Sequence, residues 1–167
     1  VLAGSHPVPD EASAKAGAEV LRFLSHTTAQ DRVIVLVSGG GSSLMVAPAA
    51  GLTLADKTAV NQALLASGLD ISEMNLVRQQ LSELKGGGLL RHAAPAAVTG
   101  YMLSDVIGDD LRAIASGPTV APLGDRASAR ATLHRVGLWE ALPDAVKTHL
   151  TTEPAALCLP EAQNSLI

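Results

Sequence analysis

The feature that most constrains this 167-residue chain is a run of five aliphatic residues, Val33 to Val37, that leads directly into a glycine-rich loop. The run shows no alternation of apolar and polar residues, which is typical of a central strand covered on both faces of a parallel sheet. Helical patterns surround it, over residues 12–24 and from Thr53 to Gly68. Strands that alternate with helices predict an α/β fold, in which ligands bind at the carboxyl ends of the strands.

We therefore expect a Rossmann-like, three-layer α/β domain with a mostly parallel sheet. A second, weaker strand is predicted over residues 97–103, and further helices over residues 75–84, 127–136 and 144–150. Asp10, Thr53 and Ser72 are the predicted N-caps of three helices, because their side chains can accept a hydrogen bond from the first turn.

Composition narrows the possible partners. The formal net charge is -4 and aromatic residues make up 2% of the chain, so neither a basic surface nor a base-stacking surface for nucleic acid is expected. The remaining candidates for a binding partner are a small molecule and another subunit, such as the second copy of a homodimer. Cys158 is the only cysteine and the longest aliphatic run is far shorter than the ~20 residues that cross a bilayer, so we expect a cytoplasmic protein without a membrane segment.

The two ends suggest a piece of a longer chain. The first residue is Val1 rather than Met, and residues 164–167 resemble the opening of a strand with no turn after it. We expect residues 1–167 to form one partial domain, because this length supports a single core.

The loop after the first strand is the first candidate site. Its missing side chains allow backbone N–H groups to converge on an anion such as a carboxylate or a phosphate, to which the serines can add hydroxyl donors. It is neither a P-loop nor a dinucleotide fingerprint, and a flexible link is the alternative. The candidate residues are Ser38, Gly39, Gly40, Gly41, Ser42 and Ser43.

A second candidate site is Lys85, which precedes three glycines beginning with Gly86. Its ammonium could meet a phosphate or carboxylate that the glycines allow to approach closely. Arg78 lies seven residues earlier, so two helical turns would place both cations on one face. The alternative is an ordinary helix end with a favourable cation and a glycine stop.

Two further polar segments could complete a cleft. Asp105 and Asp109 flank Gly108 and could hold Mg²⁺ or accept a proton from a substrate hydroxyl, although turn chemistry also explains them. His6 could bind a carboxylate or transfer a proton, and Thr119 ends a tight turn that could line the wall. A structural role is the alternative for His6.

Taken together and in this order, five segments are similar to class II glycerate kinases, also called glycerate 2-kinases, some of which are labelled hydroxypyruvate reductases. The segments are residues 5–10, 38–43, 81–88, 104–110 and 115–119. The resemblance covers nearly the whole chain and is weakest over residues 154–163. It implies the N-terminal α/β domain of a two-domain enzyme, with part of that domain and the C-terminal domain absent.

The resemblance also implies an activity: transfer of the ATP γ-phosphoryl group to the 2-hydroxyl of D-glycerate, giving 2-phosphoglycerate, with Mg²⁺. Lys85 and Asp105 would be catalytic, with Asp105 or Asp109 orienting Mg²⁺ or the hydroxyl. The isolated piece is expected to be inactive. Gln79 and Gln80 stand where the family usually has Lys and His, which puts substrate affinity carried by those positions in question.

Two other functions compete with the kinase. A hydroxypyruvate reductase would bind a nicotinamide dinucleotide, but the GxGxxG fingerprint that such a site uses is missing from the sequence. A non-catalytic sugar- or nucleotide-binding module would use the same loops without turnover.

Overall fold

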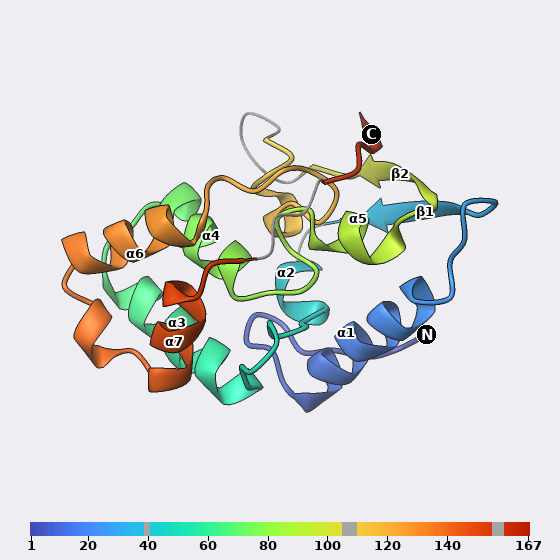
Figure 1. The fold of residues 1–167 in the computed structure, drawn as a ribbon. Helices are drawn as coiled ribbons and strands as arrows, with labels where there is room; N and C mark the ends of the chain where they lie inside the picture. The colour runs from blue at the N-terminus through green and yellow to red at the C-terminus, as the bar shows by residue number, and fades with distance from the viewer. Residues whose placement is uncertain (39–40, 105–109, 155–158) are drawn as a thin grey trace.

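The computed structural model describes residues 1–38, 41–104, 110–154 and 159–167, and it has an α/β fold (Figure 1). Three parallel strands pair in the order β1 (Arg32–Val37), β2 (Ala97–Met102) and β3 (Gln163–Leu166). The predicted α/β class and parallel sheet are therefore confirmed. The strand-like ending of the sequence is β3, which pairs with β2 from Thr99 onward.

Helices take up much of the remaining described chain, and the longer ones overlap the helices that the sequence periodicity predicts. They are α1 (Glu11–Leu24), α2 (Gly41–Leu44), α3 (Leu54–Ala66), α4 (Ile71–Gln80), α5 (Gly88–Ala93), α6 (Arg126–Arg135) and α7 (Asp144–Thr151), with short 3-10 turns η1 (Ile114–Ser116) and η2 (Trp139–Ala141). Asp10 and Thr53 cap α1 and α3 as predicted. The prediction of Ser72 as a cap is wrong, because α4 begins earlier and Asp70 accepts from Glu73 N.

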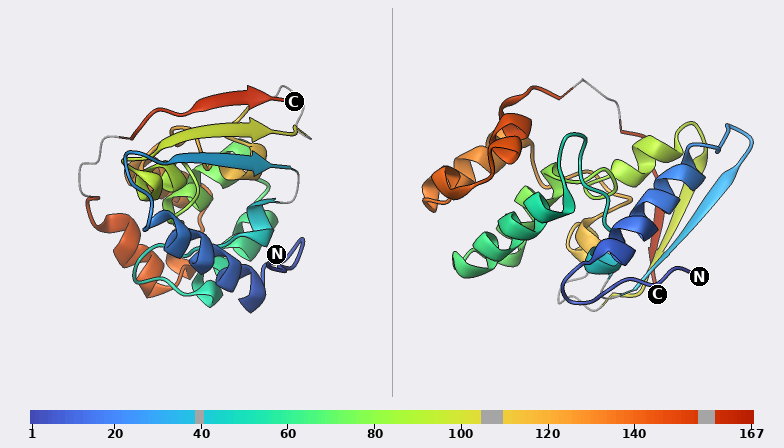
Figure 2. Two further views of the ribbon diagram at one scale, coloured as in Figure 1. Left: turned by 90° about the vertical axis from the view of Figure 1, so that its right-hand side faces the viewer. Right: turned by 90° about the horizontal axis from the view of Figure 1, so that it is seen from below.

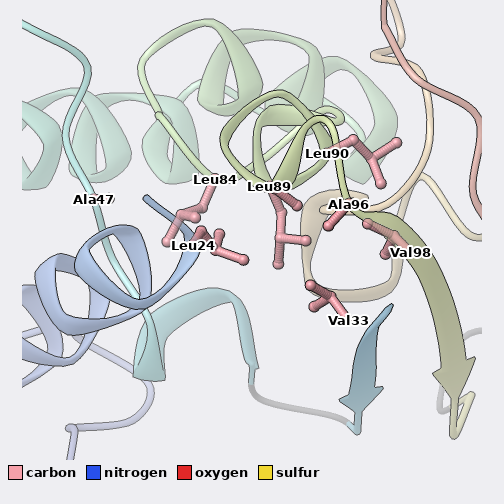
Figure 3. Close-up of a cluster of buried hydrophobic side chains, with 9 residues drawn as sticks. Leu24, Val33, Ala47, Leu84, Leu89, Leu90, Ala96 and Val98 are labelled. Atoms are coloured by element: carbon pink, nitrogen blue, oxygen red, sulfur yellow. The ribbon is translucent and has the colours of Figure 1, made fainter. Parts of the chain in front are cut away.

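One face of the sheet packs on helices. Leu24 of α1, Leu89 and Leu90 of α5, and Val33 and Val98 of the strands form a buried apolar cluster between the two layers (Figure 3). Both views in Figure 2 place the helices on this side of the sheet.

Among the described residues, the opposite face of the sheet carries exposed side chains. Ile34 and Leu36 of β1 are 62% and 76% exposed. β1 is also an edge strand, so the prediction of a central strand covered on both faces is wrong for the described residues. The described residues supply two of the three expected layers, namely the sheet and the helices on one of its faces.

A second apolar cluster holds the helices α3, α4, α6 and α7 together away from the sheet. Leu64, Val77, Leu133 and Val146 are fully buried in it. The segment from Leu81 to Gly88 runs between the two clusters, and the site described below is built around it. No described helix combines the length and apolarity that a membrane crossing requires.

Candidate anion-binding site

A pocket of about 400 Å³ opens between α2, α3, α4 and η1. Among the described residues that line it there is no Asp or Glu, whereas three cationic side chains reach it. Its polar lining includes His6, Ser42, Ser43, Lys57, Arg78 and Lys85. Cations gathered without a described counter-ion attract an anion, so this pocket is the candidate functional site.

Lys85 is the most deeply placed of the three cations, with 7% of the residue exposed. Its Nζ donates to the Ser42 carbonyl at 2.9 Å and to Ser42 Oγ at 2.5 Å. Burial, and then the neighbouring Lys57 and Arg78, lower the pKa of Lys85 well below its usual range. The structure therefore brings together the serine loop and Lys85, which the sequence presents as two separate candidate sites.

The contact between Lys85 and Ser42 belongs to a longer polar chain. Ser42 Oγ lies 3.1 Å from Ser116 Oγ, and Ser116 donates to Asn75 Oδ1 at 3.1 Å. Three segments far apart in sequence are thus fixed to one another beside the pocket. Such satisfied buried networks hold their members rigidly.

Lys57 was not predicted as a site residue. It lies on α3, and its Nζ donates to the Leu81 carbonyl at 2.9 Å. Burial, and then the proximity of Arg78, lower the pKa of Lys57 to about 8. In the sequence it looks like any solvated helix lysine, and only the tertiary arrangement shows that it faces other cations.

Arg78 has the least satisfied side chain in the pocket. Its Nε is buried and has no hydrogen-bond partner among the described residues, while Nη2 lies 3.9 Å from Met74 Sδ. Burial lowers the pKa of Arg78. A buried guanidinium N–H without an acceptor is costly and rare, so it points to a ligand.

The predicted pairing of Arg78 with Lys85 occurs, but for a different reason. Because α4 ends at Gln80, the two cations do not share a helix face. The chain instead turns at Leu81 and brings Lys85 back to the same pocket. The shared-face explanation is therefore wrong, although both residues line one site.

The three glycines after Lys85 serve packing. Gly86 N donates to the Ser116 carbonyl at 3.0 Å and Gly87 N to the Gly117 carbonyl at 2.8 Å, so neither N–H is left for a ligand. A Cβ on Gly88 would lie 2.1 Å from the Glu83 carbonyl oxygen. The close approach of backbone is therefore at Gly88, whereas a Cβ on Gly86 would lie 3.0 Å from side-chain atoms of Gln79 and Pro122. The approach of a ligand to Gly86 stays a prediction.

The partner of this glycine segment is strained. Ala115 and Ser116 have φ values of 48° and 62°, in the left-handed region that residues with a Cβ seldom adopt. Ala115 lines the pocket, and Ser116 carries the network to Ser42. Strain of this kind gathers at functional sites, which agrees with the location of the pocket.

The remaining predicted residues fall into three groups. His6 and Ser43 line the pocket. Ser38 is exposed at the end of β1. Gly41 is the first residue of α2, and a Cβ added to it would lie 3.2 Å from Ala115 Cβ. Thr119 is not in the pocket lining, because its Oγ1 donates to Asn164 Oδ1 of β3 at 2.8 Å.

Four predicted residues, Gly39, Gly40, Asp105 and Asp109, lie outside the described residues. Within the described part of the chain, no three His, Cys, Asp or Glu side chains gather as metal ligands do. The magnesium site therefore stays a prediction that rests on Asp105 and Asp109.

A second pocket, of about 680 Å³, lies on the other side of the segment from Ser82 to Gly86. Its described lining holds carboxylates as well as cations: Glu83 Oε2 lies 3.0 Å from His92 Nε2, Asp125 caps α6, and Lys85, Arg91 and Arg126 also reach the pocket. Gln79 donates to the Ser116 carbonyl at 3.2 Å, and Gln80 donates to the Gly124 carbonyl at 2.8 Å. Both glutamines therefore face away from the cationic pocket.

Comparison with known proteins identifies the family. The family described as "Domain of unknown function (DUF4147)" matches residues 1–151. The chain belongs to this family. Its DUF4147 region is similar to "Glycerate kinase" of Bos taurus, at 44% identity over 86% of this chain and 27% of the relative. It is also similar to "Glycerate 2-kinase" of Pyrococcus horikoshii, at 39% identity over 90% of this chain and 34% of the relative.

Other DUF4147 relatives carry a different name. An Agrobacterium vitis protein, provisionally named hydroxypyruvate reductase, is 51% identical over 95% of this chain and 40% of its own length. The crystal structure of a Thermotoga maritima glycerate kinase superposes with a TM-score of 0.87 at 36% identity, over 98% of this chain and 39% of that one. The resemblance to class II glycerate kinases is confirmed, and this chain spans 40% or less of these relatives.

Proposed function

We propose that this chain is part of an ATP-dependent kinase that phosphorylates the 2-hydroxyl of D-glycerate to give 2-phosphoglycerate. The observation that carries the proposal is the pocket where Lys57, Arg78 and Lys85 meet without a described carboxylate. Substrate, product and nucleotide are all anions. The relatives named glycerate kinase support the same reaction.

Phosphoryl transfer depends on positioning and charge neutralisation more than on covalent chemistry. Lys85 is held in place by both of its bonds to Ser42, so a positive group and a hydroxyl are fixed before a ligand arrives. Mg²⁺, when held by Asp105 or Asp109, would neutralise phosphate charge. Lys57 and Arg78 would hold the anionic group that lies in the pocket.

The test is release of ADP by the protein that carries this chain at the length of its relatives. With ATP, Mg²⁺ and D-glycerate, we expect ADP to appear in proportion to glycerate consumed, with phosphate on the 2-hydroxyl by NMR. ADP release that does not depend on glycerate, or a product phosphorylated elsewhere, would contradict the proposed reaction.

Hydroxypyruvate reduction is the second candidate, because the Agrobacterium relatives carry that provisional name. Oxidation of NADH by hydroxypyruvate in a parallel assay would support it. The sequence lacks the glycine fingerprint of a dinucleotide site, so we expect no such oxidation. Binding of ATP and glycerate without any turnover would instead support a non-catalytic binding module.

A further inference from the structure

Positive charge in the cationic pocket is not balanced by any described carboxylate. Lys57 and Lys85 are each tied to a neutral oxygen, the carbonyl of Leu81 or Ser42, rather than to a carboxylate. Arg78 Nε has no acceptor at all among the described residues. A single carboxylate would neutralise one of these cations and leave the others buried beside like charges, which is unfavourable.

The donors also approach from different directions. Lys57 comes from α3, Arg78 from α4, and Lys85 from the turn that follows α4. A carboxylate is planar, and one guanidinium can satisfy both of its oxygens. A phosphoryl group presents three oxygens in a tetrahedral arrangement, so it can accept from cations that surround it.

We propose that this pocket selects a doubly charged phosphoryl group over a carboxylate, and that Lys57 is the residue that sets this preference. This inference deepens the proposed function, since it rests on the kinase reaction only for the identity of the molecule that carries the phosphoryl group. Arg78 and Lys85 complete the binding site.

Lys57 sets the preference because it adds the charge that a carboxylate does not need. With Arg78 alone, the pocket can already hold a monoanion, because a guanidinium can donate two parallel hydrogen bonds to one carboxylate. A dianion gains a further charge-assisted hydrogen bond from Lys57, which is worth about ten- to a hundredfold in affinity. Burial lowers the pKa of both lysines, and repulsion from neighbouring cations lowers it further; entry of the dianion relieves that repulsion.

The experiment measures sulfate and acetate binding to the 167-residue chain by calorimetry. Sulfate is the probe because it is tetrahedral and doubly charged, as a phosphoryl group is. The variant is Lys57→Gln, and the matched control is Lys15→Gln, which makes the same change at an exposed position of α1. Circular dichroism shows whether each variant is folded, and Lys57→Met replaces Lys57→Gln if the latter unfolds.

We expect Lys57→Gln to weaken sulfate binding by at least about tenfold and acetate binding by less than about threefold, and Lys15→Gln to change neither. The proposal is overturned if sulfate binds the unaltered chain no better than acetate. Equal losses for both anions in the variant would overturn it as well, because Lys57 would then matter to the pocket without setting its preference.

Competition identifies the source of the phosphoryl group. Displacement of sulfate by 2-phosphoglycerate assigns the pocket to the product, and displacement by a non-hydrolysable ATP analogue assigns it to the nucleotide. Displacement by D-glycerate alone, with neither phosphorylated ligand effective, would contradict the proposal. If the protein at the length of its relatives releases no ADP in response to glycerate, but sulfate still binds as expected, the proposed function is refuted and this inference stands.

Discussion

Two pockets lie on either side of the segment from Ser82 to Gly86, and they differ in their carboxylates: the described lining of one holds none, and that of the other holds Glu83 and Asp125. In the smaller one, three cations are buried together with no described carboxylate. In the larger one, Glu83 pairs with His92 beside the cations Lys85, Arg91 and Arg126. The nitrogen and the oxygen of the Gln79 amide both bond backbone groups there. A buried charge without a partner costs stability, so a ligand explains it better than it explains a charge that already has a counter-ion.

The largest effect on function is expected from Lys85→Met in the protein at the length of its relatives. Removal of a pre-positioned cation should lower turnover by about a hundredfold to a thousandfold. Glycerate-dependent ADP release measures it. Lys15→Met, on the exposed face of α1, is the control and should be unaffected. Near-normal turnover of Lys85→Met would remove Lys85 from the catalytic site.

The segment from Leu81 to Gly88 is packed so closely at Gly88 that it should tolerate no methyl group there. Gly88→Ala places a Cβ 2.1 Å from the Glu83 carbonyl oxygen, so backbone has to move and we expect a loss of about 3 kcal/mol in unfolding free energy. Denaturant unfolding measures it. Gly51→Ala has a φ of 83° but no atom within 4 Å, and should lose only about 1 kcal/mol. Equal losses would refute the packing role.

Glu83→Gln tests the ion pair between Glu83 and His92 in the larger pocket. It weakens the bond to His92 Nε2 and the bond at 3.1 Å from Ala50 N, so we expect a loss of about 1 kcal/mol. Burial raises the pKa of Glu83, but these hydrogen bonds outweigh it and the net pKa lies below its usual value. Stability from Glu83 is therefore present above the usual glutamate pKa and is lost as pH falls through the folded value. The variant should show a weaker dependence on acid pH.

Arg78→Met tests the smaller, cationic pocket, and it should raise the free energy of unfolding where Glu83→Gln lowers it. The variant removes a buried N–H that lacks an acceptor, so we expect a gain of about 1 kcal/mol in unfolding free energy together with loss of sulfate binding. Arg22→Met, at a surface pair with Glu19, should change stability by less than about 0.5 kcal/mol. Destabilisation by Arg78→Met would show that the guanidinium is structural.

Features fixed by local chemistry were predictable from the sequence. Asp10 and Thr53 cap their helices, because a capping side chain needs only the next three residues. Ser72 failed as a cap because Asp70, two residues earlier, competes for the same role. The expected cover on both faces of β1 also failed, because burial depends on which helices reach the strand.

The candidate site was predictable in part. The serine loop and Lys85 were recognised from glycine-rich motifs, and the structure brings Ser42 and Lys85 into contact. Lys57 carries no motif, because its burial beside Arg78 arises only when α3 packs on α4. The roles of Asp105 and Asp109 stay predictions.

The most direct test is the pH dependence of sulfate binding to the chain between pH 7.5 and 9.5. Lys57, with a pKa of about 8, shares the pocket with Lys85, Arg78 and His6, and an entering dianion favours the protonated lysines. We expect affinity to fall by at least about tenfold across this range, and by clearly less in Lys57→Gln. Affinity that does not change with pH, or an equal fall in the variant, would contradict a site built from unpaired lysines.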